Sequence, residues 1–130
     1  MNRRGENAEA YICDFGSSSK LKSSSEMSDF RIGTQGYIAP EILLGRAYSF
    51  GIDVWSLGCV MHILVAGYPP FWDNDKINQR KLVCSQPLNL NTDRHLNCLD
   101  FQAKSLLTSM LEKNPLMRPT IDEVLAHPWL

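Results

Sequence analysis

The chain contains 130 residues, of which 44% are hydrophobic, and its formal net charge is −1 at pH 7. This length accommodates one domain or part of one, and the composition is typical of a soluble globular protein. Because there is neither a basic excess nor a long Lys/Arg run, we expect no nucleic-acid-binding surface.

Neither a secretory signal nor a membrane span is expected. The charged residues 1–10 are not followed by an apolar stretch, which a signal peptide requires. The longest apolar run, residues 52–67, contains Asp53 and His62 and is shorter than the ~20 residues of a membrane-spanning helix. We therefore expect residues 52–67 to form a buried helix.

The cysteines are widely and irregularly spaced and form no Cys-x-x-Cys pair, which argues against a zinc site. They are Cys13, Cys59, Cys84 and Cys98. Free thiols in a reducing compartment, the cytoplasm or the nucleus, are the expectation.

The first part of the chain predicts a strand, a loop and a short helix. Residues 10–13 are short and β-prone and fit a strand that ends at residues 14–16. Residues 17–28 include seven serines, so we expect a loop that buries little. Residues 39–45 predict a short helix stopped by Gly45.

The next segments predict a core helix, a surface helix and a loop. Residues 52–66 are apolar on nearly every face, which predicts a helix in the middle of a core. It should end at Gly67, before two prolines. Residues 73–84 are polar and predict a surface helix with Asp73 as its N-cap. Residues 85–99 are rich in Asn, Ser and Pro and predict a loop.

Two further helices are predicted near the end of the chain. One carries a stripe with the spacing of a single helix face, formed by Ala103, Leu106, Leu107, Met110 and Leu111. It should end by residues 114–115. The other begins at residues 119–123, where Thr120 and Glu123 have capping-box spacing. Its expected buried face is Ile121, Val124 and Leu125, and the whole chain is predicted to be mainly α.

Several separated motifs resemble the protein-kinase family. They are Asp14-Phe15-Gly16, Gly33-Thr34-Gln35-Gly36-Tyr37-Ile38, Ala39-Pro40-Glu41, Asp53-Val54-Trp55-Ser56-Leu57-Gly58, Asn114-Pro115, Arg118-Pro119 and His127-Pro128-Trp129. Each is weak alone, but their order makes the resemblance specific. It implies a partial kinase C-terminal lobe over residues 10–130, with a short N-terminal strand, the activation segment and about five helices. Residues 1–9 do not match the motifs.

The resemblance implies a magnesium and ATP site around Asp14, which alone would be interpreted as a surface loop aspartate. In the kinase template this aspartate holds Mg²⁺ against the ATP phosphates. Phe15 would pack between the two lobes, and Gly16 would let the backbone turn. Cys13 would line the ATP pocket, although its residue type favours a small buried hydrophobe.

The resemblance also implies the class of substrate. Gly33, Thr34, Gly36 and Tyr37 match the loop that receives the residue after the phosphoacceptor, and Thr34 matches the threonine that binds the catalytic aspartate in Ser/Thr kinases. By residue type alone, Thr34 is a turn residue. Phe30 occupies a position where many kinases are phosphorylated, as also seen in the calcium/calmodulin-dependent group, which the closing His-Pro-Trp resembles too. Ser28 is the nearest alternative phosphoacceptor.

Four further residues have structural roles by resemblance. Glu41 and Arg118 should form a buried ion pair, whereas Asp53 and Trp55 belong to the central helix. Asp53 would normally hold the catalytic loop, which has no counterpart in this sequence, so we expect it to lack that partner.

Two hypotheses for function follow. In the first, the chain is part of a Ser/Thr kinase that uses ATP and Mg²⁺ on protein substrates, and the 130 residues alone are inactive because they contain no His-Arg-Asp motif, glycine-rich loop or strand lysine. In the second, the chain is a non-catalytic interaction module that docks partners through the helix from residue 73. We further expect marginal stability, because part of the central helix would be exposed.

Overall fold

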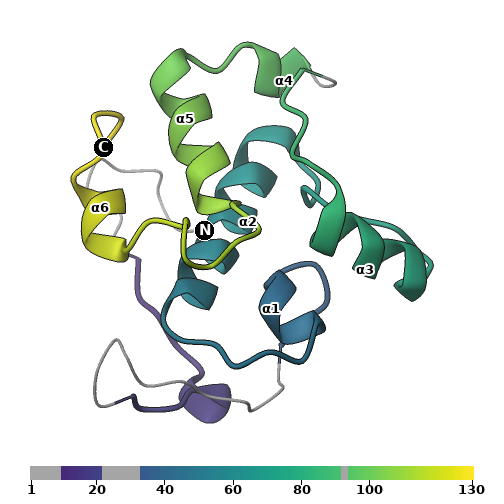
Figure 1. The fold of residues 1–130 in the computed structure, drawn as a ribbon. Helices are drawn as coiled ribbons and strands as arrows, with labels where there is room; N and C mark the ends of the chain where they lie inside the picture. Colours follow the sequence, from purple (N-terminus) through teal and green to yellow (C-terminus); the bar gives the residue numbers. More distant parts are fainter. Residues whose placement is uncertain (1–9, 22–32, 92–93) are drawn as a thin grey trace, which may run out of the picture.

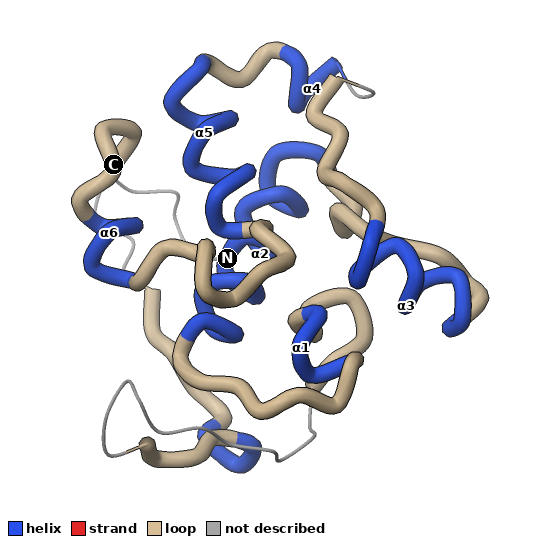
Figure 2. Tube along the Cα trace, viewed as in Figure 1, coloured by secondary structure: helices blue, strands red, loops and turns tan. Residues whose placement is uncertain are grey.

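The computed structural model describes residues 10–21, 33–91 and 94–130. The described part is mainly helical, as predicted, and contains no strand (Figures 1 and 2). Its elements are the 3₁₀ helix η1 (Phe15–Ser17) and the α-helices α1 (Pro40–Leu43), α2 (Gly51–Ala66), α3 (Lys76–Ser85), α4 (Arg94–Asn97), α5 (Phe101–Met110) and α6 (Ile121–Leu125). None of these helices is long and apolar enough to cross a membrane.

The short strand expected at residues 10–13 is not formed. Tyr11 and Ile12 expose 81% and 87% of their surface, and the described residues provide no neighbouring strand. A strand needs a partner for its N–H and C=O groups, so β-prone residue types alone do not form one here. The expectation of a strand was wrong.

Helix α2 is the centre of the fold and packs against α5 and α4 (Figure 1). Trp55 and Cys59 of α2 are almost fully buried together with Leu107 of α5. Gly58 allows α2 to approach the end of α5 closely, because a Cβ there would lie 3.0 Å from both Met110 Cβ and Leu111 Cδ2. A larger residue at this point would require Met110 or Leu111 to shift by a few tenths of an ångström.

Only one side of α2 is enclosed, although its composition predicted burial on nearly every face. Leu57, Val60 and Leu64 remain 44%, 41% and 81% exposed. Their spacing of three and four residues places them on one helix face. The helix therefore carries an exposed stripe, formed by Leu57, Val60 and Leu64, which we call the α2 stripe.

Glycines end the first two helices as predicted. Gly45 follows α1 with φ +70°, and its N–H donates to Ile42 O while Arg46 N–H donates to Glu41 O, the pattern of a Schellman motif. Gly67 follows α2 with φ +84° and donates to Ile63 O at 2.8 Å. These positive φ values favour glycine over residues with a Cβ.

The middle of the chain differs from the prediction at two points. The N-cap of α3 is Asp75, whose Oδ1 accepts from Ile77 N and Asn78 N, whereas Asp73 accepts only from Asp75 N. The predicted loop 85–99 contains α4, because Leu96 is 1% exposed and anchors one helical turn in the core. A single buried leucine among polar residues gives no detectable periodicity.

The last two helices form where predicted. All five residues of the predicted stripe are buried, four of them in α5 and the fifth, Leu111, at its C-cap. The helix ends at Met110, before the Asn114-Pro115 pair. Thr120 and Glu123 form the predicted capping box at α6. Of the expected buried face only Val124 is buried, since Ile121 and Leu125 are 48% and 66% exposed.

Candidate functional site

The ion pair expected between Glu41 and Arg118 is present and buried. Arg118 donates from Nη1 to Glu41 Oε1 at 2.7 Å and from Nη2 to Glu41 Oε2 at 3.0 Å. Glu41 and Arg118 are only 2% and 6% exposed. This two-point geometry is the strongest arrangement of an arginine and a carboxylate.

Arg118 also satisfies backbone groups from two other segments. Its Nη1 donates to Gly51 O at 2.7 Å and its Nε to Glu112 O at 3.0 Å, and its guanidinium lies 5.2 Å from the Trp55 ring centre. One side chain thereby joins α1, the start of α2 and the segment after α5. The pair fixes residues 39–43 relative to the core.

Lys113, which the sequence analysis did not single out, lies beside a pair of aromatic rings. Trp55 and Phe71 stack with ring centres 5.7 Å apart, and Lys113 Nζ lies 3.3 Å from the Phe71 centre and 5.0 Å from the Trp55 centre. Such contacts favour the charged ammonium group. Burial acts in the opposite direction and lowers the pKa of Lys113 to about 8.

The Asp14-Phe15-Gly16 segment is exposed. Asp14 has a left-handed backbone with φ +64°, so the turn falls at Asp14 rather than at Gly16. Phe15 is 67% exposed and Cys13 is also exposed. Cys13 is therefore not the buried hydrophobe that its residue type favours, whereas the packing of Phe15 between two lobes stays a prediction.

Asp14 fits a magnesium ion only as one ligand among several. Among the described residues, no three His, Cys, Asp or Glu side chains gather in a way that could hold a metal. Mg²⁺ is commonly bound by one or two carboxylates together with substrate phosphates and water, and an exposed carboxylate such as Asp14 is compatible with that ligand set.

The segment 33–38 forms a turn that is anchored on α2. Tyr37 N–H donates to Thr34 O at 3.1 Å, and Ser56 Oγ donates to Tyr37 O at 3.0 Å. Gly36 has φ +94°, and a Cβ there would lie 3.3 Å from the Trp72 ring. Thr34 itself is exposed, and no hydrogen bond in the described structure joins Asp14 to this turn.

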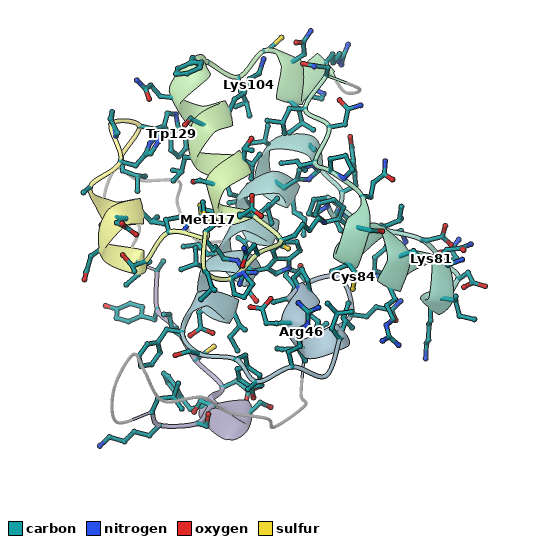
Figure 3. All side chains as sticks on the ribbon, in the orientation of Figure 1. Arg46, Lys81, Cys84, Lys104, Met117 and Trp129 are labelled. Atoms are coloured by element: carbon teal, nitrogen blue, oxygen red, sulfur yellow. The ribbon has the colours of Figure 1, made fainter. Side chains whose placement is uncertain are left out.

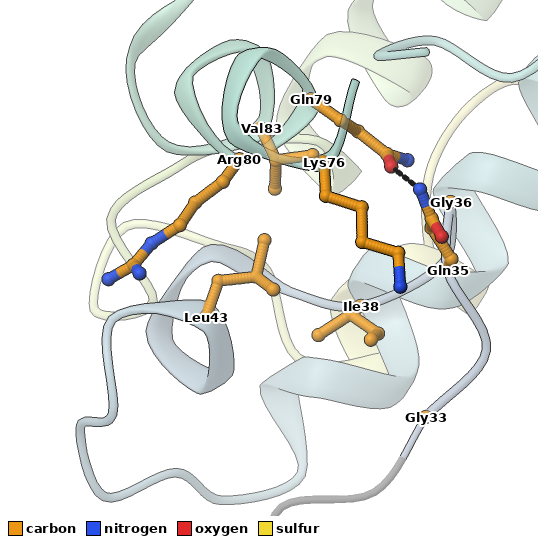
Figure 4. Close-up of a pocket in the computed structure, with 9 residues that line it drawn as sticks. All are labelled: Gly33, Gln35, Gly36, Ile38, Leu43, Lys76, Gln79, Arg80 and Val83. Carbon is orange, nitrogen blue, oxygen red and sulfur yellow. Dashed lines mark hydrogen bonds between the residues drawn. The ribbon is translucent and has the colours of Figure 1, made fainter. Parts of the chain in front are cut away.

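A pocket lies between this turn, α1 and α3 (Figure 4). It encloses about 230 Å³ and is lined by Gly33, Gln35, Gly36, Ile38, Leu43, Lys76, Gln79, Arg80 and Val83. Gln35 Nε2 donates to Oε1 of Gln79, which is 4% exposed and connects the turn to α3. The contributions of Gln79, Arg80 and Val83 could not be predicted from the sequence, because no pattern relates α3 to residues some 40 positions earlier.

The backbone N–H of Asp53 donates to Phe50 O at 3.0 Å, and the expectation that its side chain lacks the catalytic loop as a partner stays a prediction. Asp53 is exposed on one side, and the burial of the rest of its side chain raises its pKa. Trp55, two residues on, is buried at 1% exposure. The phosphorylation hypothesis for Ser28 and the interpretation of Phe30 lie outside the described residues.

Comparison with known proteins covers almost the whole chain. The family model for the protein kinase domain matches residues 3–130. A probable serine/threonine-protein kinase of Zea mays is 37% identical over 94% of this chain and 19% of its own length. Calcium/calmodulin-dependent protein kinases type II of Caenorhabditis briggsae and Caenorhabditis elegans are 34% identical over 98% of this chain, and 24% and 17% of their own lengths.

The chain thus spans about a fifth of the length of these curated relatives. The start expected at residue 10 stays a prediction, as do the roles of individual site residues. Because the family model matches nearly every residue and these relatives are all named as protein kinases, the chain belongs to the protein kinase domain family.

Proposed function

We propose that the protein to which these residues belong transfers the γ-phosphoryl group of ATP to Ser or Thr hydroxyls of protein substrates. The observation that carries the proposal is the buried Glu41–Arg118 pair, because it fixes the end of the activation segment on the helical core. A chain with this pair, the 33–38 turn and Asp14 has the parts that present a protein substrate to a bound nucleotide.

Each site residue has a distinct role in this proposal. Asp14 binds Mg²⁺, with ATP bound beside Cys13, Phe15 and Gly16, and the metal when bound offsets charge on the transferring phosphoryl group. Thr34 orients the catalytic aspartate, and the turn at Gly33, Gly36 and Tyr37 receives the substrate. Glu41, Arg118, Trp55 and Asp53 hold the scaffold.

We propose that the 130 residues by themselves do not transfer phosphate. The sequence contains no His-Arg-Asp motif to orient the acceptor hydroxyl and no glycine-rich loop over the phosphates. Asp14 would then be a metal ligand in a chain that lacks the catalytic base.

The test uses the longest in-frame product that contains residues 1–130, incubated with Mg-ATP and two peptides that differ only in a Ser or Tyr acceptor. We expect transfer to the Ser peptide, and a loss of at least about 100-fold in Asp14→Asn, the size expected when one group that stabilises transition-state charge is removed. Transfer that is unaffected in Asp14→Asn, or that favours Tyr, would refute the proposal.

An interaction module is the second candidate, favoured by the largely exposed α3 at the edge of the molecule (Figure 1). Transcript sequencing upstream of Met1 separates the two: an extension encoding His-Arg-Asp supports the kinase, and an in-frame stop codon supports the module.

In either case we propose a reducing location, cytoplasm or nucleus, because all four cysteines are free.

A further inference from the structure

The 33–38 turn has little support from its own residues. The backbone bond that the structure describes within it runs from Tyr37 N–H to Thr34 O at 3.1 Å. Gly33 and Gly36 have no side chain to pack, and glycine is the residue with the greatest backbone freedom. A turn of this composition keeps one conformation only where neighbouring elements hold it.

Side chains from two other elements hold this turn by hydrogen bonds. Ser56 Oγ of α2 donates to Tyr37 O at 3.0 Å, and Gln79 Oε1 of α3 accepts from Gln35 Nε2 (Figure 4). Ser56 thus attaches the end of the turn. Because Gln35 directly follows Thr34, the bond to Gln79 restrains the part of the turn that carries this threonine.

Gln79 is buried on a part of α3 that is itself fixed. Gln79 and Val83 lie one turn apart on the same helix face and are 4% and 5% exposed. At the end of the helix, Lys113 Nζ donates to Leu82 O at 3.3 Å. A buried amide without a partner is costly, and Gln35 is the side chain that bonds the Gln79 amide in the described part of the chain. Gln79 is therefore a fixed point to which the turn is attached.

We propose that Gln79 is a positioning residue that, through Gln35, holds the 33–38 turn in the conformation that receives the protein substrate. The inference rests on the proposed kinase function for the identity of what the turn receives. It adds α3 to the elements that control the turn, because the loss of Gln79 releases Gln35 and Thr34 even where Gln79 does not touch the substrate.

Hydrogen exchange at the Tyr37 amide of the full 130-residue chain reports how firmly the turn is held, without ATP or substrate. Gln79→Met keeps a side chain of similar volume but removes the amide. We expect exchange at Tyr37 to become about two- to tenfold faster, the size expected for one lost hydrogen bond. Gln35→Met should have the same effect, and the double variant should add little, since both changes remove one bond. Lys81→Met places the same side chain on the outer edge of α3 (Figure 3) and should leave the rate unchanged.

The kinetic test uses the longest in-frame product that contains residues 1–130, with a Ser peptide and Mg-ATP. We expect Gln79→Met to raise the KM for the peptide about two- to tenfold and to leave the KM for ATP unchanged. A residue that only stabilised the fold would instead lower kcat through the folded fraction and leave both KM values unchanged. Gln79→Glu should restore the KM for the peptide, since its carboxylate still accepts from Gln35 and the cations Lys76 and Arg80 line the same pocket.

Circular dichroism confirms that each variant is folded. If a substitution at the buried Gln79 does not fold, Gln35→Met removes the same bond from an exposed position and should raise the KM for the peptide equally.

The outcomes separate this inference from the proposed function. Unchanged exchange at Tyr37 in Gln79→Met, or the same change in Lys81→Met, overturns the inference, and so does faster exchange without a higher KM for the peptide. Faster exchange together with a higher KM that Gln79→Glu restores supports it. A longer product that transfers no phosphate refutes the kinase proposal instead, and the exchange rates alone then decide whether Gln79 holds the turn.

Discussion

At the scale of single residues, the Glu41–Arg118 pair should dominate stability. In Glu41→Ala, Arg118 keeps its bonds to Gly51 O and Glu112 O but remains buried without the one carboxylate that pairs with it among the described residues. Stranding a buried charge costs about 3–5 kcal/mol in the free energy of unfolding. Urea denaturation of the variant measures this loss.

Two variants control for this result. Asp122→Ala removes an exposed acid in the first turn of α6 and should cost less than about 1 kcal/mol. Glu41→Met/Arg118→Met removes both charges and should lose less stability than Glu41→Ala alone, because no charge is stranded. A double variant that is less stable than Glu41→Ala would contradict this account.

Lys113 should give the protein an unusual dependence on pH. Burial lowers its pKa from 10.5 to about 8, so above pH 8 the unfolded chain binds more protons than the folded one and stability rises with pH. Burial raises the pKa of Cys59 from 9.0 to about 12, which lowers stability as pH rises above 9. The net increase in the free energy of unfolding should therefore occur between pH 8 and pH 9.

The measurement is the melting temperature at pH 7.5 and pH 9 for the unmodified chain and for Lys113→Met, which keeps a stem of similar length over Phe71. We expect a higher melting temperature at pH 9 for the unmodified chain and little or no increase in Lys113→Met. Equal increases in both proteins would assign the effect to groups other than Lys113.

At the scale of elements, the N-cap of α3 distinguishes two neighbouring aspartates. Asp75→Ala removes bonds to Ile77 N and Asn78 N and should cost about 0.5–2 kcal/mol. Asp73→Ala removes one exposed turn bond to Asp75 N and should cost about 0.5 kcal/mol or less. Urea denaturation of both variants tests the assignment. A larger loss of stability in Asp73→Ala would instead support Asp73 as the N-cap, as predicted from the sequence.

Elements defined by local signals could be predicted from the sequence. The capping box of Thr120 and Glu123 acts within four residues, and hydrogen bonds from the Thr120 backbone and side chain lower the pKa of Glu123. The buried face of α5 was predicted from the helical spacing of its apolar residues alone. Helix α4 could not be found, because Leu96 is buried by contacts with distant residues rather than by a repeated pattern.

Tertiary contacts explain why the candidate site was only partly predictable. Motif resemblance located Asp14, Thr34, Glu41 and Arg118 in the sequence, and the ion pair then followed. Gln35 and Gln79 are 44 residues apart, and Gln79 belongs to no motif, so the pocket that they line appears only in three dimensions. The exposure of Ile121 and Leu125 has the same origin, since an apolar residue is buried only where another element covers it.

At the scale of the whole molecule, the α2 stripe should limit stability and solubility. Leu57, Val60 and Leu64 are partly to largely exposed. At ~1.5–3 kcal/mol for each fully buried side chain, the free energy of burial that they do not contribute is about 2–5 kcal/mol. That is a large fraction of the ~5–15 kcal/mol of a typical domain. We expect the 130-residue chain to unfold below about 50 °C and to self-associate through the stripe.

Leu64→Lys tests the stripe because Leu64 is 81% exposed, so the substitution should change the free energy of unfolding by no more than about 0.5 kcal/mol. It should lower the apparent mass in concentration-dependent light scattering. Leu116→Lys makes the same change at a residue that is 90% exposed and outside the stripe. If both variants reduce association equally, net charge and not the stripe is responsible; if only Leu64→Lys does, the apolar face of α2 is the surface through which the chain self-associates.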